Sequence, residues 1–195
     1  MKLWDKGFSI DKQIEQFTVG NDREIDIHIA KYDVQASLAH AKMLASIGII
    51  SEEELTGLIS GLNDLTKDIE KGDFVIEESF EDVHSKIEYE LTKKLGEGGK
   101  KIHTARSRND QVLVACQLYY KDNLQLINDK VKTLFDTLLG LADTYKDKLL
   151  PGYTHLQVAM PSSFGLWFSA YAEILVDDVQ PVSYTHLTLP TIYSV

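Results

Sequence analysis

The first 150 residues of this 195-residue chain contain no proline. Because proline interrupts helices, a stretch of this length without it permits long ones. Within the stretch, residues 109–150 include a single glycine, Gly140, and apolar side chains recur along the whole segment. A continuous helix over that range would be about 60 Å long. Such a helix must be covered by others in a bundle or an oligomer. The sequence therefore predicts an all-α fold.

Shorter helices are predicted upstream of the long one, each followed by a glycine that can end it. Ser51 and Glu54 have the spacing of a capping box, which opens the second of these helices. The predicted helices and their glycines are Asp22 to Ile47 with Gly48, Ser51 to Ile69 with Gly72, and Val83 to Leu95 with Gly96. No segment alternates apolar and polar residues over a sustained run, so no strand is predicted.

The charge balance limits the partners that the chain can have. Thirty acidic residues against 20 basic ones give a formal net charge of −10. This sum argues against a general nucleic-acid binder and against binding to an anionic membrane surface. The apolar run 164–176 covers about 13 residues and includes Glu173, which is too short to cross a bilayer. The start of the chain has no signal-peptide core, and a cytoplasmic protein is expected.

The sequence contains no motif for a metal or a nucleotide. The single cysteine, Cys116, excludes an intrachain disulfide and a cysteine zinc cluster. His28 and His40 would lie about 18 Å apart on a continuous helix, too far to share a metal ion. A phosphate-binding loop, a dinucleotide fingerprint and a zinc-protease motif are all missing. We therefore expect no metal and no cofactor.

A cationic segment precedes the long helix. Residues 103–110 place Arg106, Ser107, Arg108 and Asn109 next to one another. Guanidinium groups bind carboxylates through two parallel hydrogen bonds, and a helix N-terminus adds free N–H groups. The segment is thus a candidate site for an anionic substrate, with a carboxylate as the expected group. The alternative is a solvated turn in which Asn109 or Asp110 only caps the helix.

A second segment of interest follows the long helix. Pro151-Gly152 ends that helix, and Thr154, His155 and Gln157 come next, before a helix start at residues 161–163. A loop histidine beside hydroxyl and amide groups can act as a general acid or base near neutral pH. The alternative is a histidine that only hydrogen-bonds the turn. Serine-hydrolase chemistry has little support, because the chain has no Gly-x-Ser-x-Gly elbow.

His84 is a weaker candidate. It follows Asp82, which is expected to cap the helix that begins there, and it falls in the first turn of that helix. An isolated histidine at such a position is usually structural.

The two loop segments together resemble a known family. His103-Thr-Ala-Arg-Ser-Arg-Asn-Asp-Gln111 and Pro151-Gly-Tyr-Thr-His-Leu-Gln157 look like the N-terminal signatures of the argininosuccinate lyase family, within the fumarase/aspartase superfamily. Leu3-Trp4 with Gly7-Phe8, and Glu81 to Ser85, are similar to other stretches of that family. The resemblance runs from residue 1 to about residue 180.

The resemblance implies an all-α homotetramer whose active sites are shared between subunits and whose central helices form one bundle. It implies reversible β-elimination of argininosuccinate to arginine and fumarate, the last step of arginine biosynthesis, without a cofactor. It also implies an N-terminal helical domain over residues 1–110 and the beginning of the central bundle over 111–180. The implied roles are catalysis by His155, substrate binding by Ser107, Arg108, Asn109 and Thr154, and support from His84, Arg106 and Gln157.

The chain departs from the family pattern at two positions. Many relatives have glycine where this chain has Ala105, which is a tolerable change. More of them have serine at the position of Gly20, where the serine contacts substrate, and glycine has no hydroxyl to make that hydrogen bond.

The family's catalytic serine lies on a Gly-Ser-Ser-rich loop well beyond residue 180, and nothing in this chain matches it. We therefore expect the chain to be the N-terminal part of a longer enzyme and to be inactive by itself. Two alternatives remain open: a non-catalytic helical protein, such as the lens crystallins related to this lyase, or another lyase of the superfamily that releases fumarate.

The last 15 residues, 181–195, contain no charged side chain. Residues 181–187, Pro-Val-Ser-Tyr-Thr-His-Leu, back-translate to CCTGTCTCTTATACACATCT, the transposon end used in sequencing adapters. We expect this tail to be a translated adapter and not native protein. A continuous reading frame through the tail in trimmed genomic reads would contradict this expectation.

Overall fold

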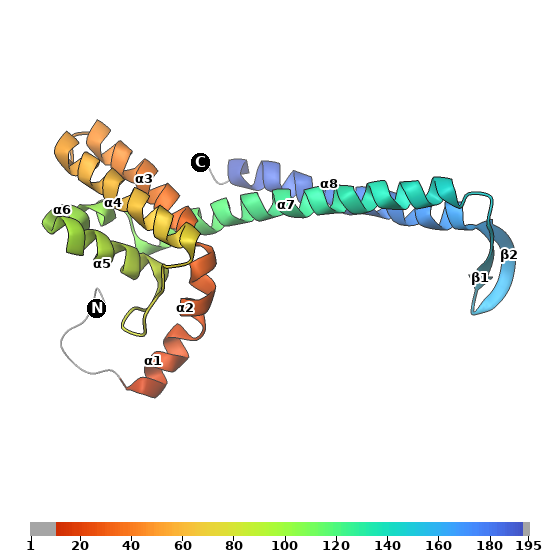
Figure 1. Ribbon diagram of the computed structural model, residues 1–195, viewed down its shortest axis with the longest axis horizontal. Coiled ribbons are helices and arrows are strands. Elements are labelled where there is room, and N and C mark those ends of the chain that lie inside the picture. Colours follow the sequence, from red (N-terminus) through yellow and green to blue (C-terminus); the bar gives the residue numbers. More distant parts are fainter. Residues whose placement is uncertain (1–10, 193–195) are drawn as a thin grey trace. The chain divides into compact units, whose positions relative to one another are not determined.

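The computed structural model describes residues 11–192, without the side chains of Glu15 and residues 182–192. The Leu3-Trp4 and Gly7-Phe8 stretches, and residues 193–195 of the expected tail, lie outside the described residues. The chain forms two compact units, one up to Tyr120 and one from Lys121 onward. The boundary falls inside the long helix α7 (Figure 1). The two units are considered separately below.

Every regular element among the described residues of the first unit is a helix. Its elements are α1 (Lys12–Val19), α2 (Asp22–Ile25), the 3₁₀ turn η1 (Asp26–His28), α3 (Ala30–Ser46), α4 (Glu52–Lys71), α5 (Val83–Leu95), α6 (Glu97–Lys100), the 3₁₀ turn η2 (Lys101–His103) and the start of α7 (Arg108–Thr144). Helices α3, α4 and α5 pack around one apolar core, whose fully buried members include Leu44, Leu58, Leu62, Ile87 and Leu91.

The local signals for α4 and α5 are confirmed. Ser51 and Glu54 form the capping box, with each side chain bonded to the other's backbone N–H at 3.2 and 2.9 Å. Gly72 ends α4 in the left-handed conformation, at φ 78°. Asp82 caps α5 by accepting the Ser85 N–H at 2.7 Å.

The single helix predicted for residues 22–47 is wrong, because the segment divides into α2, η1 and α3. Arg23 donates hydrogen bonds to the carbonyls of Phe80 and Glu78, at 2.7 and 2.9 Å. Asp26 accepts the N–H of Val83 at 3.2 Å. These bonds connect α2 and η1 to backbone groups of the segment around the start of α5. Long-range contacts thus outweigh the local helical pattern.

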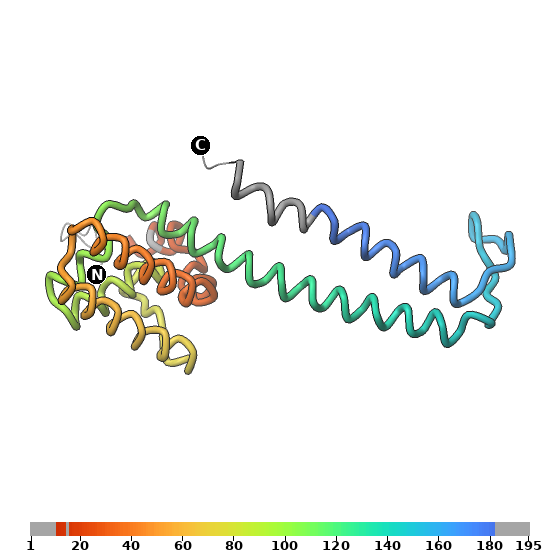
Figure 2. The backbone as a smooth tube through the Cα atoms, turned by 90° about the horizontal axis from the view of Figure 1, so that it is seen from above, coloured from red at the N-terminus to blue at the C-terminus, as the bar shows by residue number. Residues whose placement is uncertain are grey.

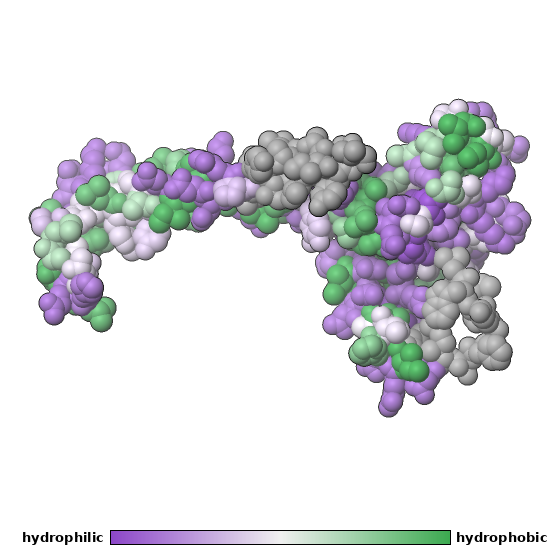
Figure 3. All heavy atoms as spheres, turned by 180° about the vertical axis from the view of Figure 1, so that it is seen from behind, coloured by the Kyte–Doolittle hydropathy of each residue, from purple (hydrophilic) through white to green (hydrophobic). Residues whose placement is uncertain are grey.

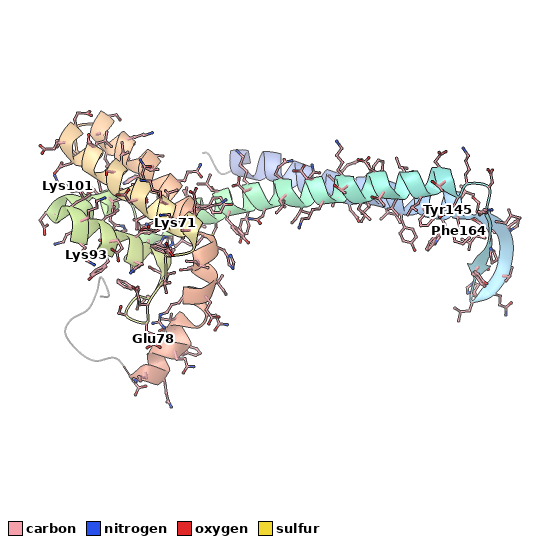
Figure 4. All side chains as sticks on the ribbon, viewed as in Figure 1. Lys71, Glu78, Lys93, Lys101, Tyr145 and Phe164 are labelled. Carbon is pink, nitrogen blue, oxygen red and sulfur yellow. The ribbon has the colours of Figure 1, made fainter. Side chains whose placement is uncertain are left out.

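The second unit is a helical hairpin with a small sheet at its turn. It contains the remainder of α7, strands β1 (Leu149–Thr154) and β2 (Gln157–Ser163), and α8 (Phe164–Ile192). Helix α8 returns alongside α7, as Figures 1 and 2 both show. Tyr145 and Phe164 lie at the end of the pair from which the strands emerge (Figure 4). A Cβ at Gly165 would lie 2.8 Å from the Cα of Lys146, so only glycine permits this approach.

Much of the apolar surface of this helix pair remains uncovered. Ala142 and Ala172 are buried, but many large apolar side chains along the pair are exposed (Figure 3). The exposed residues include Leu126, Ile127, Leu134, Leu139, Leu166, Trp167, Tyr171, Ile174 and Val176. In the part of the chain that the structure describes, no helix combines the length and the apolar composition needed to cross a membrane.

The all-α fold class is confirmed, and the described residues add one small two-stranded sheet that was not predicted. Helix α7 ends at Thr144 instead of Leu150, because Leu149 and Leu150 pair with Ser163 and Ser162 of β2. The helix start predicted at residues 161–163 is also strand, and α8 begins at Phe164. A sheet of two strands has no buried face, and nearly every residue of both strands is exposed or half-buried. The alternating pattern that identifies a strand depends on one buried face, so the sequence could not show it.

Candidate functional site

The arginine loop, residues 103–110, ends in a capped helix start. Ser107 caps α7: its hydroxyl accepts the Asp110 N–H at 3.2 Å, and the Asp110 carboxylate accepts both the N–H and the hydroxyl of Ser107 at 2.8 Å. These bonds hold the pKa of Asp110 below its usual range. The residue in the cap position is therefore Ser107, and neither Asn109 nor Asp110 occupies it. Asn109 is exposed in the first turn.

Arg108 joins α7 to α5. Its Nη1 donates to Gln111 Oε1 at 3.0 Å and its Nη2 to Ser85 Oγ at 3.3 Å. Its Nε lies 3.6 Å from an oxygen of Asp82 in an ion pair. An arginine has five N–H donors, so these contacts leave two for another ligand.

Arg106 points toward α3. Its Nη2 donates to Ser37 Oγ at 2.9 Å. Burial lowers the pKa of the Arg106 guanidinium, which stays charged at physiological pH nevertheless. The Nε of Arg106 and the Nδ1 of His103 are buried without a hydrogen-bond partner. The loop thus contains buried donor capacity that its own protein contacts do not use.

His84 is held by a partner that the sequence analysis missed. The His84 ring is 1% exposed, and its Nδ1 lies 2.9 Å from Oδ2 of Asp33, which is itself fully buried. The carboxylate of Asp33 also accepts two hydrogen bonds from Gln111 Nε2, at 3.0 and 3.1 Å, and one from Ser37 Oγ at 3.3 Å.

Burial alone would raise the pKa of Asp33, but the hydrogen bond from His84, the charge of His84 and the bond from Gln111 outweigh it and lower that pKa below its usual value. Asp33 is therefore an ionised group inside the core. A sequence signal for it exists in retrospect, because Ala30, Asp33, Ser37 and Ala41 lie on the buried face of α3. An aspartate on such a face is rarely buried without a partner.

The segment that leads into the arginine loop is fixed at several points. Lys101 of η2 donates to the capping-box residue Glu54 (Figure 4). His40 Nε2 lies 2.8 Å from the carbonyl oxygen of Thr104. A Cβ at Gly99 would lie 2.4 Å from the Leu91 carbonyl oxygen, so α6 can approach α5 only through glycine. Ala105 has a φ of 58°, a left-handed conformation that favours glycine.

The second candidate group lies at the hairpin tip, Thr154–Gln157. Thr154 pairs with Gln157, and His155 and Leu156 form the two-residue turn between the strands. Their φ values are 50° and 64°, the two left-handed residues of a type I′ turn, for which Asn-Gly is the common choice. The His155 side chain is exposed, and Leu156 is 98% exposed.

The structure therefore brings the predicted residues together in two sets. Arg106, Arg108 and His84 belong to one hydrogen-bonded network in the first unit, with Ser107 and Asn109 at its edge. Thr154, His155 and Gln157 lie together at the hairpin tip of the second unit. Among residues 11–192, no three histidine, cysteine, aspartate or glutamate side chains gather in a way that could hold a metal ion.

Gly20, at the end of α1, has φ 53° and ψ −126°. This region of backbone space is accessible to glycine and not to residues with a Cβ. A serine at this position would require a different local backbone.

Comparisons with known proteins agree with the resemblance. The profile of a family described as Lyase matches residues 8–191. The argininosuccinate lyase of Parabacteroides distasonis is 55% identical over 179 residues, which are 92% of this chain and 40% of that protein. The argininosuccinate lyase of Thermotoga neapolitana is 46% identical over 179 residues, 92% of this chain and 45% of that protein. The chain thus spans less than half the length of these relatives, as expected for part of a longer protein.

Solved structures of more distant proteins share the fold. An EDDS lyase in complex with formate matches with a TM-score of 0.73 and 22% identity, over 92% of this chain and 35% of that one. The beta-carboxy-cis,cis-muconate cycloisomerase of Acinetobacter calcoaceticus matches with a TM-score of 0.69 and 19% identity, over 89% of this chain and 40% of that one. The helical architecture of the chain is therefore that of these enzymes.

Proposed function

The chain belongs to the lyase family, and on that premise we propose that the protein containing it is an argininosuccinate lyase. Such an enzyme splits argininosuccinate reversibly into arginine and fumarate by β-elimination. The observation that carries the proposal is the arginine loop, where two guanidinium groups lie at the N-terminus of the 37-residue helix α7. The cytoplasmic location stays a prediction from the sequence.

The loop suits a substrate with carboxylates. The two donors that Arg108 leaves unused can bind a carboxylate, and the helix N-terminus adds a positive dipole end. Elimination removes a poorly acidic proton beside a carboxylate, so negative charge develops on that carboxylate. Groups that hold this charge lower the barrier. The Ser107 hydroxyl can bind the substrate only if it gives up its hydrogen bond to Asp110. Asn109 is exposed and can bind the substrate directly.

His155 is the proposed group for proton transfer. Its exposed ring lies at a turn with Thr154 beside it, and histidine is a common general acid or base. Thr154 would donate a hydrogen bond to a succinyl carboxylate, and Gln157 would support the turn. The proposed reaction uses no cofactor, since the elimination consists only of bond cleavage within the substrate and proton transfer.

We further propose that the complete protein is a homotetramer whose active sites combine residues of several subunits. The exposed apolar side chains of α7 and α8 support this, because surfaces of this kind are normally covered in an assembly. The 195-residue chain alone should therefore self-associate and release no fumarate.

The test is fumarate release from argininosuccinate by the full-length protein, followed by absorbance. We expect turnover, and we expect His155→Asn to reduce kcat by about 10²- to 10⁴-fold. His28→Asn, a histidine outside both groups of candidate residues, is the matched control and should retain activity. Turnover of a different fumarate-releasing substrate would favour another lyase of the superfamily. A full-length protein without any turnover would favour the non-catalytic, crystallin-like alternative.

A further inference from the structure

The buried carboxylate of Asp33 has no assigned role in the proposed reaction, yet it contacts three side chains from three helices. These are Ser37 on α3, His84 on α5 and Gln111 on α7. All four side chains are nearly inaccessible, with exposures between 0 and 4%. A charge at such a place is stabilised only by well-oriented donors.

Two of these partners also accept a hydrogen bond from an arginine of the loop. Gln111 donates to Asp33 through Nε2 and accepts from Arg108 through Oε1, at 3.0 Å. Ser37 donates to Asp33 through its hydroxyl proton and accepts from Arg106 on the same oxygen, at 2.9 Å. Each arginine of the loop is therefore linked to the Asp33 carboxylate through one intervening side chain.

The chemistry of a carboxylate gives this arrangement a direction. An ionised carboxylate can only accept hydrogen bonds. It therefore forces the Gln111 amide to present its NH₂ group inward and its oxygen toward Arg108. It likewise accepts the hydrogen bond of the Ser37 hydroxyl. The lone pairs of that oxygen are then left to accept from Arg106. A neutral amide at position 33 could donate as well as accept and would fix neither orientation.

We propose that Asp33 is a positioning residue, which orients Gln111 and Ser37 so that they hold the guanidinium groups of Arg106 and Arg108 in place for the substrate. This inference rests on the proposed function for its catalytic consequence, but the geometry that it predicts is independent of activity. Asp33 touches neither substrate nor reacting atoms, and it acts through the side chains that it orients.

The experiment compares Asp33→Asn with Asp64→Asn in the full-length protein. Asp64 is a carboxylate of α4 in the same unit, and it accepts hydrogen bonds from Lys67 and Lys94. In the crystal structure of Asp33→Asn we expect the Arg108–Gln111 and Arg106–Ser37 bonds to be lost. We expect KM for argininosuccinate to rise about tenfold or more, with a smaller fall in kcat. Asp64→Asn should change neither.

Retention of both arginine bonds and of the wild-type KM in Asp33→Asn would overturn the proposal. If that variant does not fold, Ser37→Ala tests the proposal, because it removes only the hydrogen bonds that link Asp33 to Arg106. A several-fold rise in KM supports the role, and an unchanged KM together with an unmoved Arg106 refutes it. A wild type that releases no fumarate would remove the proposed function, whereas the arginine positions in the variants would still test the role of Asp33.

Discussion

The arginine loop and the hairpin tip differ in how their geometry is maintained. The loop is anchored by side chains of α3, α5 and α7 around a buried carboxylate. The tip consists of two left-handed residues, neither of them glycine, with exposed side chains. The loop is thus preorganised by its own unit, whereas the tip presents His155 from a strained and uncovered turn. In the proposed enzyme, order at the tip must come from contacts that this chain alone does not provide.

The largest effect on the loop is expected from Gly99→Ala. The new Cβ would lie 2.4 Å from the Leu91 carbonyl oxygen, and backbone must move to admit it. We expect a loss of about 3 kcal/mol of local stability. Hydrogen exchange of the α5 and α6 amides in the full-length protein measures it. Gly98→Ala is the control, because nothing lies within 4 Å of its Cβ. Equal protection in the two variants would show that the packing of α6 does not hold the loop.

Acid should weaken the first unit through Asp33. The pKa of Asp33 is lower in the folded protein than its ordinary value of 3.8, so its ionised form stabilises the fold above that pH. This stabilisation is lost as the pH falls through the folded pKa. Asp26, whose pKa is raised by burial, acts in the opposite sense.

At neutral pH, Asp33→Asn should therefore reduce stability by about 2 kcal/mol, and the difference from wild type should shrink below pH 4. Unfolding midpoints from pH 6 to pH 3 measure the trend. A difference that stays constant with pH would show that the charge of Asp33 is irrelevant.

The same contrast explains what the sequence could predict. The ends of α4 and α5 follow from residues a few positions apart, such as Ser51 with Glu54. A short stretch of sequence around each helix end is therefore enough to identify these signals. Asp33 is separated from His84 by 51 residues and from Gln111 by 78, so its role depends on the folded packing. The hairpin escaped prediction for a different reason. Neither face of its strands is buried, and His-Leu occupies a turn normally marked by Asn-Gly.

At the hairpin tip, Leu156→Gly should be stabilising. Glycine removes the left-handed strain, about 1–2 kcal/mol, and adds unfolded-state entropy that offsets part of the gain, about 0.4–1 kcal/mol. We expect a net gain of about 0.5–1 kcal/mol, seen as slower exchange of the β1 and β2 amides. Val158→Gly, at a strand position opposite Tyr153 that has no left-handed backbone, should speed that exchange instead. Faster exchange in Leu156→Gly would mean that the leucine side chain itself stabilises the turn.

Ala105→Gly makes the matching change in the arginine loop and should have the smallest effect. Alanine at φ 58° has a smaller side chain than leucine. The strain that glycine releases is about balanced by the added unfolded-state entropy. The free energy of unfolding should therefore change by about 0.5 kcal/mol or less in either direction. The bonds from Arg106 to Ser37 and from Arg108 to Gln111 lie outside the substituted residue, so the loop should keep its geometry and the full-length protein its KM. A KM that rises with Ala105→Gly would show that the stiffness of the backbone at residue 105, and not the side-chain network alone, keeps the two arginines in place. The loop would then resemble the hairpin tip in depending on a strained residue.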